Sequence, residues 1–358
     1  MSFGMNNIKV NPVGMIFLVI LGGGTLLLIR NSFYGKDKSS GSSEQGELVS
    51  MKQLLVASIQ LAERGGRVVK EIRDTNKLNE ASKGKTKEGA NNPVTDGDMK
   101  SHEAIISGFQ KSFPSVFVVS EEHEDKVFDM NKVTPVAKDL PEVSKIIQSD
   151  EKIPVSDITV WVDPLDATQE YTEDLVEYVT TMVCVAVKGV PTMGVIHKPF
   201  LENGPKTTWA WVGKGHAAHL KEIKHHTEAL ESPRIIVSRS HSGQVEEVSK
   251  KTFGAGTKVN PAGGAGYKVM SLLEDQSDIY IHVTLIKKWD ICAGNAILTE
   301  MKSKMTTLKG ETISYDRADD PKAPDGLLAT VWDHTEFLAK LKPVYEELKA
   351  DQKPKAKK

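Results

Sequence analysis

Two aspartates, three positions apart, follow a strand-like run in the middle of the chain. The run Ile158–Val162 is apolar, and Asp163 and Asp166 stand directly behind it. Pro164 fixes its own φ near about −65°, so we expect it to end the strand and let both carboxylates turn toward one point. The backbone carbonyl of Leu165 can face the same point. Two carboxylates and a carbonyl form a hard oxygen set of the kind that binds Mg²⁺, although such a segment also occurs as an ordinary surface turn.

Thr168 follows where a helix could begin, with its hydroxyl near the same point. The segment Asp-Pro-Leu-Asp-Ala-Thr resembles the signature of the lithium-sensitive, magnesium-dependent phosphatases related to inositol monophosphatase. The continuation Gln-Glu-Tyr-Thr-Glu resembles the branch of that family that hydrolyses 3′-phosphoadenosine 5′-phosphate (PAP). Ala167 stands where most of the family has glycine. We therefore expect no positive φ at this position.

Three further acidic residues match family motifs in the same order along the chain. Glu121 opens a Glu-Glu pair behind the strand-like run Val116–Val119, a pairing that is otherwise typical of a solvated surface. Asp98 fits the pattern Thr-x-x-Asp, whose ordinary role is to cap a helix. Asp290 lies in Trp-Asp-Ile-Cys-Ala, which resembles the family motif Trp-Asp-x-x-Ala. The resemblance implies a metal site made of Asp98, Glu121, Asp163, Leu165, Asp166 and Asp290.

The implied chemistry explains why so many acids are needed. Two or three Mg²⁺ ions would screen the phosphoryl oxygens and make an attacking water easier to deprotonate. We expect Asp98 and Thr168 to be the catalytic pair, with Thr168 accepting a hydrogen bond from the water or relaying its proton, and Asp98 orienting the hydroxyl. The family resemblance also implies inhibition by Li⁺. Cys184 and Cys292 stand in apolar surroundings, so we expect buried free thiols there rather than a nucleophile or a disulfide.

Substrate recognition is expected from two segments of the second half. Ser238 and His241 belong to Val-Ser-Arg-Ser-His-Ser, and Gly264 and Lys268 belong to Pro-Ala-Gly-Gly-Ala-Gly-Tyr-Lys. Both segments resemble those that hold the adenosine 5′-phosphate part of PAP. Hydroxyl and imidazole donors, close backbone approach at glycine and a lysine charge suit a phosphate or a base. A glycine-rich turn before a helix is otherwise a common packing device.

Composition is typical of a folded enzyme. The formal net charge of −2 over 358 residues gives no sign of a nucleic-acid-binding surface. Helical and strand-like patterns alternate without repeats, which predicts a layered α/β or α+β domain. A long helix is expected within 48–79, with a weak point at Gly65–Gly66, and residues 124–157 are expected to leave the core. The resemblance implies the sugar-phosphatase fold, with layers in the order α-β-α-β-α.

The N-terminus predicts a membrane attachment. Residues 12–29 are an uncharged run that would reach roughly 27 Å as a helix, enough to cross a bilayer core. No cleavage site follows the run, so we favour an uncleaved transmembrane signal anchor over a signal peptide. Flanking lysines and arginines favour a cytoplasmic catalytic domain, whereas the resemblance to Golgi-anchored members of the PAP branch favours the lumen. We follow the resemblance.

These observations predict an organisation and a function. The expected segments are a tail (1–11), the anchor (12–29), a flexible stalk (30–49), a metal-binding half (50–232), a nucleotide-binding half (233–345) and a lysine-rich tail (346–358). The expected activity is Mg²⁺-dependent hydrolysis of PAP to AMP and phosphate in the Golgi lumen, where PAP is a by-product of sulfotransferases. The alternatives are an inositol phosphate phosphatase and an inactive membrane-tethered scaffold. The sequence leaves the oligomeric state open, a homodimer included.

Overall fold

The structure is a computed structural model that describes residues 46–85, 89, 91–124, 126–240 and 244–351. The expected anchor, most of the expected stalk and His241 lie outside the described residues. Among the helices that are described, none is long and apolar enough to cross a membrane.

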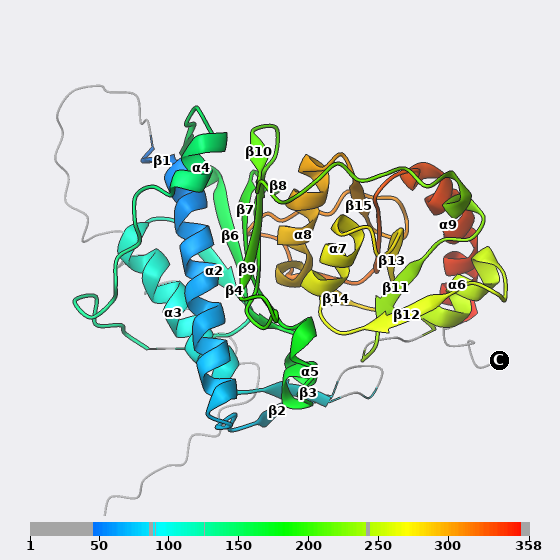
Figure 1. Ribbon diagram of the computed structural model, residues 1–358, viewed down its shortest axis with the longest axis horizontal. Coiled ribbons are helices and arrows are strands. Elements are labelled where there is room, and N and C mark those ends of the chain that lie inside the picture. Colours follow the sequence, from blue (N-terminus) through cyan, green and yellow to red (C-terminus); the bar gives the residue numbers. More distant parts are fainter. Residues whose placement is uncertain (1–45, 86–88, 90, 125, 241–243, 352–358) are drawn as a thin grey trace, which may run out of the picture. The chain divides into compact units, whose positions relative to one another are not determined.

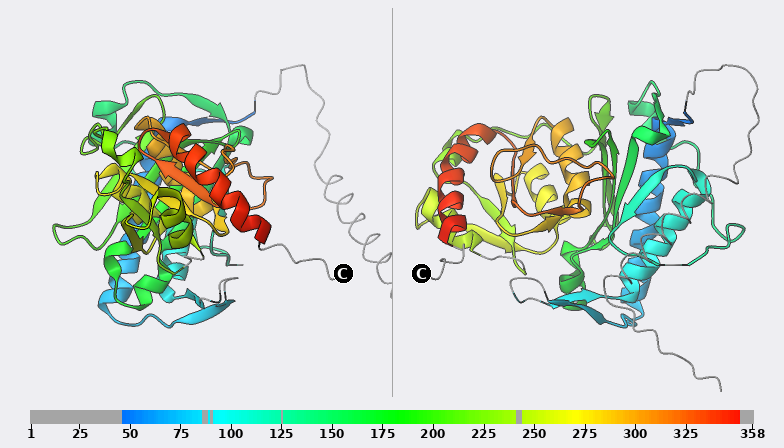
Figure 2. Two further views of the ribbon diagram at one scale, coloured as in Figure 1. Left: turned by 90° about the vertical axis from the view of Figure 1, so that its right-hand side faces the viewer. Right: turned by 180° about the vertical axis from the view of Figure 1, so that it is seen from behind.

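Residues from Gly46 onward form one compact unit with five layers. Helices α2 (Met51–Asp74) and α3 (Asp96–Ser112) cover one face of a six-stranded sheet. Helices α7 (Ala265–Leu273) and α8 (Lys288–Glu300) lie between that sheet and a five-stranded sheet. Helices α6 and α9 cover the outer face of the second sheet, and the view from behind shows the same succession (Figures 1 and 2). The predicted α-β-α-β-α layering is confirmed.

The two sheets are built from separate parts of the chain. The six-stranded sheet has the order β10-β9-β8-β7-β6-β4 and is antiparallel except for the parallel pair β4 and β6. The five-stranded sheet has the order β12-β11-β13-β17-β15 and is mixed. The strands of the first sheet are β4 (Phe117–Ser120), β6 (Ile158–Asp166), β7 (Thr180–Val187), β8 (Val190–Lys198), β9 (Lys206–Trp211) and β10 (Gly215–His216). Those of the second are β11 (Ile235–Ser238), β12 (Val259–Ala262), β13 (Ile279–His282), β15 (Lys304–Thr306) and β17 (Leu327–Thr330).

Smaller elements complete the unit. Helices α6 and α9 span Val245–Phe253 and His334–Asp351, and the short helices α4 and α5 span Pro141–Ile146 and Thr168–Thr172. Three two-stranded pairs are β1 (Leu48–Ser50) with β5 (Lys152–Pro154), β2 (Ala81–Lys85) with β3 (Asn91–Val94), and β14 (Ile286–Lys287) with β16 (Lys322–Ala323). Single 3₁₀ turns lie at Val155–Asp157, Val176–Tyr178 and Thr227–Leu230. The stretch 124–157 is less detached than expected, because Val143 and Ile147 are buried in the core.

The expected weak point in α2 is not a break. The helix runs unbroken through Gly65 and Gly66, both of which are buried. A Cβ atom at Gly65 would stand 2.5 Å from the Ser101 hydroxyl, and one at Gly66 would stand 2.3 Å from the His197 ring. These glycines therefore let α2 pack closely against α3 and the sheet.

Strand β6 does not end at Pro164, contrary to the sequence prediction. It continues to Asp166, but its register with β7 shifts between Asp163, which faces Met182, and Asp166, which faces Thr180. Three residues of β6 thus span two residues of β7, which is a bulge. A proline has no N–H for the ladder and is tolerated at such an irregularity.

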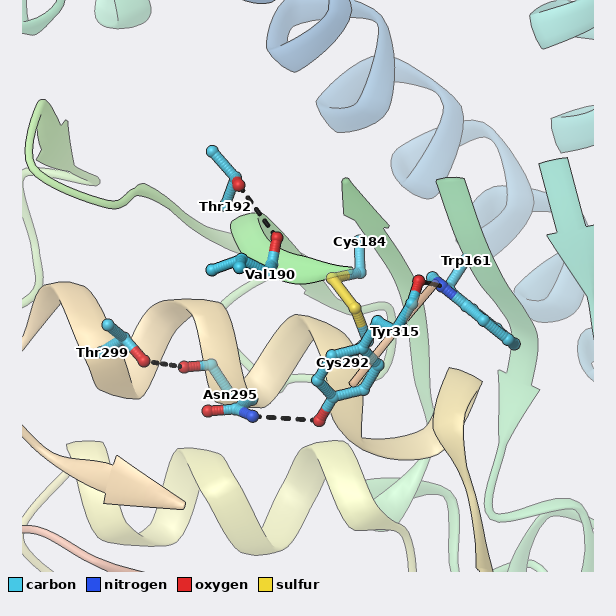
Figure 3. Close-up of a disulfide and its surroundings, with 8 residues drawn as sticks. All are labelled: Trp161, Cys184, Val190, Thr192, Cys292, Asn295, Thr299 and Tyr315. Atoms are coloured by element: carbon cyan, nitrogen blue, oxygen red, sulfur yellow. Dashed lines mark hydrogen bonds between the residues drawn. A yellow bond between two sulfur atoms is a disulfide. The ribbon is translucent and has the colours of Figure 1, made fainter. Parts of the chain in front are cut away.

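The prediction of free thiols is wrong, because Cys184 in β7 and Cys292 in α8 form a disulfide (Figure 3). The two cysteines are 108 residues apart in sequence, so no local pattern pairs them. Helix α8 reaches the sheet closely because Gly194 of β8 faces it. A Cβ atom there would stand 2.1 Å from the Ala293 carbonyl oxygen.

Candidate active site

Three carboxylates meet where three elements end or begin. Glu121 directly follows β4, Asp163 lies in the neighbouring strand β6, and Asp290 lies in the first turn of α8. Strands β4 and β6 are parallel, so their carboxyl ends share one edge of the sheet. One carboxylate oxygen of each residue lies within 4.8 Å of the others. The structure therefore brings together three of the six predicted metal ligands as one cluster.

Burial and mutual repulsion between carboxylates both raise the pKa values of this acidic cluster, and the Lys83 charge opposes them at Glu121. Burial raises the pKa of Glu121 to about 7, and the neighbouring Glu122 and Asp98 charges act in the same direction. Burial, followed by the charges of Glu121 and Asp166, raises the pKa of both Asp163 and Asp290 well above the ordinary range. A divalent cation would relieve this repulsion and would favour the ionised carboxylates. The donor set is all oxygen, which fits Mg²⁺.

A lysine that sequence reasoning passed over faces the same cluster. Lys83 of β2 lies 3.1 Å from Glu121 and also pairs with Glu122. Lys-Gly-Lys-Thr around it resembles a fragment of a phosphate loop but lacks the first glycine of that motif, so no sequence pattern places Lys83 near the acids. Its ion pairs raise its own pKa, against the opposing effect of burial.

Asp98 and Thr168 are in contact, although 70 residues separate them. The Thr168 hydroxyl donates to Asp98 Oδ1 at 2.8 Å and lies 3.2 Å from the Leu165 carbonyl oxygen. The other carboxylate oxygen of Asp98 accepts from the backbone N–H and the hydroxyl of Thr95, each at 2.7 Å. Burial raises the pKa of Asp98 to about 6. Thr95 therefore fixes Asp98, and Asp98 in turn orients the hydroxyl of Thr168.

Asp166 accepts hydrogen bonds from a different set of donors than Asp163 does. Its two oxygens accept from the backbone N–H groups of Ala265 (3.0 Å) and Gly266 (2.8 Å) and from the Thr180 hydroxyl (3.0 Å). The first two belong to the N-terminus of α7. The amides of the glycine-rich segment, expected to approach a phosphate or a base, are thus used on a carboxylate of the first half. Thr180 was not predicted to take part.

The turn between β6 and α5 departs from its expected conformation. Ala167 has φ 73° and ψ 44°, in the left-handed region, so the prediction that no positive φ is needed there is wrong. This residue directly follows β6 and precedes Thr168. A single left-handed residue reverses the chain so that the Thr168 hydroxyl can turn back toward the Leu165 carbonyl. The family's usual glycine would adopt this conformation with less strain.

A pocket of about 400 Å³ lies over the acids, and residues of the second half form part of its wall. Ser238, Gly264 and Lys268 line it together with Glu121 and Asp163. Gly264 has φ 61°, and a Cβ atom there would stand 2.7 Å from the Tyr178 carbonyl oxygen and 2.8 Å from Asp166. This residue must therefore be glycine for α7 to reach the first half.

Lys268 is held inside the protein. Its side chain is 2% exposed, and its ammonium donates to the carbonyl oxygens of Ala262 and Gly264. Burial lowers its pKa to about 8, while the Asp166 and Glu170 charges oppose that change. The lysine thus supports the turn that lines the pocket as well as adding positive charge to its wall.

Two further cationic side chains near the pocket were not predicted. Lys287 lines it directly before the Trp-Asp motif, and its ammonium lies 5.0 Å from the Trp289 ring centroid. The Arg239 guanidinium lies 3.1 Å from the carboxylate of the buried Glu170, and this ion pair joins the second half to α5. Arg239 lies in the same segment as Ser238 and His241, the residues expected there to hold the nucleotide. Its ion pair depends on tertiary packing that has no sequence signature.

Comparison with known proteins agrees with this geometry. The model of the inositol monophosphatase family matches residues 50–345. A human relative named Golgi-resident adenosine 3′,5′-bisphosphate 3′-phosphatase is 44% identical over 355 residues, covering 93% of this chain and 96% of the relative. A Xenopus laevis relative named inositol monophosphatase 3 is 44% identical over 344 residues, covering 93% and 95%.

Solved structures share the fold. The extragenic suppressor protein suhB from Bartonella henselae superposes with a TM-score of 0.61 at 17% identity, covering 82% of this chain and 98% of that one. Inositol monophosphatase II from Staphylococcus aureus superposes with a TM-score of 0.59 at 18% identity, covering 85% and 99%. With the acidic cluster, the layered fold and the match along the whole described unit, the chain belongs to the inositol monophosphatase family of phosphatases.

Proposed function

We propose that this chain hydrolyses the 3′-phosphate of PAP to give AMP and phosphate, with Mg²⁺ as its cofactor. PAP is the adenosine 3′,5′-bisphosphate in the names of its 43–44% identical relatives. The observation that carries the proposal is the three-carboxylate cluster beneath a pocket whose opposite wall comes from the second half. A phosphate ester can lie over the acids while the rest of a nucleotide extends along that wall.

The metal set is proposed as two or three Mg²⁺ ions held by Glu121, Asp163, Asp166, Asp290 and the Leu165 carbonyl, with Asp98 adjoining. When bound, the ions would neutralise charge on the phosphoryl oxygens and favour ionisation of the attacking water. Li⁺ would inhibit by replacing a weakly held Mg²⁺, because Li⁺ carries only half the charge of that ion. Asp166 already accepts three hydrogen bonds, which leaves about one of its four lone pairs for a metal ion.

The chain's own catalytic contribution is proposed to come from Thr168 and Asp98. Because Thr168 donates its proton to Asp98, its oxygen lone pairs remain available to accept a hydrogen bond from the attacking water. Asp98 is fixed by Thr95 and holds the hydroxyl in that orientation. Water would attack the phosphorus directly, so no phospho-enzyme forms.

Substrate choice is proposed to reside in 233–345, with Ser238, His241, Gly264 and Lys268 facing the nucleotide, while 50–232 supplies every proposed metal ligand except Asp290. A Lys268→Ala variant tests this division. A lost charge-assisted hydrogen bond raises KM for PAP by roughly tenfold to a hundredfold. A small phosphate ester without the adenosine 5′-phosphate should be affected far less. Equal loss on both substrates would assign Lys268 to the support of the 262–264 turn alone.

An inositol phosphate phosphatase is the second candidate, because one 44% identical relative carries the name inositol monophosphatase 3. Turnover of PAP and inositol 1-phosphate, each with and without Mg²⁺, separates the two. We expect Mg²⁺-dependent phosphate release with a clear preference for PAP. Preference for the inositol ester would replace the proposed substrate. No Mg²⁺-dependent turnover of either would favour the third alternative, an inactive scaffold.

We also propose that residues 12–29 anchor the protein in the Golgi membrane with the catalytic domain in the lumen. The relatives named Golgi-resident support the compartment. The Cys184–Cys292 disulfide supports the lumenal side over the cytoplasmic side favoured by flanking charges, because disulfides persist in oxidising compartments. Protease added to sealed microsomes should spare the domain until detergent is added, and digestion without detergent would reverse the proposed orientation.

A further inference from the structure

The disulfide joins β7, which pairs with the strand that carries Asp163, to α8, which carries Asp290. Cys184 faces Trp161 across the β6–β7 ladder, and on the same ladder Asp163 faces Met182. Cys292 follows Asp290 by two residues in the first turns of α8. The cross-link thus joins the strand beside Asp163 to the helix end that carries Asp290 (Figure 3).

The helix end needs such a restraint because its carboxylate is repelled by its neighbours. When ionised, Asp290, Asp163 and Glu121 repel one another, because their oxygens lie within 4.8 Å of one another. On α8 itself, Asp290 accepts a hydrogen bond from the Lys287 N–H at 3.1 Å, which holds its side chain to the helix but not the helix to the sheet. Without a cation, repulsion favours movement of this helix end away from Asp163.

The other contacts of α8 are non-covalent. In its first turn, Lys288 N–H donates to the Pro321 carbonyl oxygen at 2.8 Å, and the Trp289 ring centroid lies 6.5 Å from that of Trp161 in β6. The Asn295 amide donates to the Tyr315 hydroxyl at 3.0 Å, and the Trp161 indole donates to the Tyr315 carbonyl oxygen at 2.9 Å (Figure 3). The tight approach at Gly194 involves Ala293 and Ile297. The disulfide adds to these contacts a covalent restraint two residues from Asp290.

We propose that the Cys184–Cys292 disulfide is a positioning cross-link that holds Asp290 at metal-binding distance from Asp163 and Glu121, so that metal affinity depends on the redox state of this pair. The inference rests on the proposed metal site. Reduction by glutathione converts the disulfide and two glutathione thiols into two protein thiols and one oxidised glutathione, and oxidation is the reverse. Both cysteines are at most 1% exposed, so exchange requires α8 to open.

The direct test compares Mg²⁺ binding by calorimetry in the oxidised wild-type protein and in a C184V/C292A variant. Valine suits a strand, alanine suits a helix, and the combined side-chain volume is nearly conserved. We expect about tenfold weaker Mg²⁺ binding in the variant, with kcat at saturating Mg²⁺ changed less than about twofold. Val248→Ala, in the buried face of α6, is the control for a general loss of stability and should bind Mg²⁺ like wild type.

The outcomes separate the inference from the proposed function. Equal Mg²⁺ affinities in the wild type and a folded variant would overturn the positioning role. Failure of the wild type itself to bind Mg²⁺ would overturn the proposed metal site. Weaker binding in Val248→Ala to the same degree would also overturn the inference, because any loss of stability would then have the same effect.

A second measurement needs no substitution. Because coupling between two equilibria is reciprocal, a tenfold effect of the disulfide on Mg²⁺ affinity requires a tenfold effect of Mg²⁺ on the disulfide equilibrium. In glutathione redox buffers, with circular dichroism showing that the reduced chain stays folded, Mg²⁺ should lower the midpoint potential by about 30 mV. A midpoint that does not respond to Mg²⁺ would overturn the proposal, as would a reduced chain that stays folded and binds Mg²⁺ normally.

Discussion

At the scale of single residues, the contact between Thr168 and Asp98 links the sequence motif to the proposed chemistry. The Thr168 hydroxyl uses its only proton to donate a 2.8 Å hydrogen bond to Asp98, so its oxygen remains an acceptor for water. The neighbouring Leu165 carbonyl, at 3.2 Å, restricts the hydroxyl further. The role of Thr168 therefore depends on its oxygen, whereas its methyl group is dispensable.

Replacing Thr168 by valine removes this oxygen while keeping the shape of the side chain. Loss of a positioned general acid–base group typically slows a reaction by about 10²–10⁴-fold, so we expect a fall in kcat of that size. Thr168→Ser should retain most of the activity because it keeps the hydroxyl. Mg²⁺ affinity, measured by calorimetry, should change little in either variant. A valine variant with near-normal kcat would remove Thr168 from the catalytic pair.

At the scale of elements, the turn from β6 into α5 carries a conformational cost that the sequence does not reveal. Ala167 is held in the left-handed region, where a Cβ atom is disfavoured by about 1–2 kcal/mol. The turn nevertheless keeps this conformation because Asp166 before it and Thr168 after it are both fixed by hydrogen bonds.

An Ala167→Gly variant should therefore be more stable than the wild type. Relief of the backbone strain stabilises the folded state by more than the glycine stabilises the unfolded chain through its extra conformational entropy, which is about 0.4–1 kcal/mol. We therefore expect a net gain in stability of up to about 1 kcal/mol. Urea denaturation of the two proteins under identical conditions measures the difference. A less stable glycine variant would show that the left-handed turn costs nothing here.

Sequence patterns predicted the elements well where hydrophobic periodicity is strong. The strand-like runs 116–119 and 158–162 form most of β4 and part of β6, and the long helix expected within 48–79 is α2. Helix α2 was anticipated, but Gly65 and Gly66 were misread, because periodicity does not show which glycines face a neighbouring element. Pro164 was misread for a similar reason, since a bulge depends on the partner strand.

The candidate site was predictable only in part. Short motifs identified Glu121, Asp163 and Asp290, because metal-binding acids recur at element ends with recognisable neighbours. Lys83 and the Cys184–Cys292 pair were missed, since they come from positions whose proximity exists only in the folded chain. The division into halves at 232 and 233 and the role of His241, which lies outside the described residues, remain predictions.

At the scale of the whole molecule, buried histidines couple the fold to acid pH. Burial lowers the pKa of His197 and of His334 to about 4. The His334 ring is hydrogen-bonded at both nitrogens, to the hydroxyls of Thr306 (2.9 Å) and Thr330 (3.0 Å). The unfolded chain binds a proton at each histidine near pH 6.5, whereas the folded chain binds it only near pH 4. The stability that these neutral histidines contribute is therefore fully present above pH 6.5 and is lost as the pH falls toward 4.

The difference between wild type and His334→Gln isolates one of these histidines from the acids of the metal site. By pH 5 the wild type should lose about 2 kcal/mol of unfolding free energy, relative to pH 7.5, that the variant does not lose. Chemical denaturation at a series of pH values, at fixed ionic strength and with chelator present, measures this difference. A constant difference between the two proteins from pH 7.5 to 5 would show that His334 is not held neutral by the fold.

The central claim is that the buried carboxylate cluster carries phosphate-ester hydrolysis, and Asp163→Asn tests it most directly. Asparagine keeps the shape and can still accept the hydrogen bond that Leu165 N–H donates at 3.1 Å, but it removes one charge from the cluster. We predict that phosphate release from PAP at saturating Mg²⁺ falls by at least about a hundredfold, while the metal-free variant is as stable as the wild type or more so. Near-normal phosphate release by a folded Asp163→Asn protein would contradict the account.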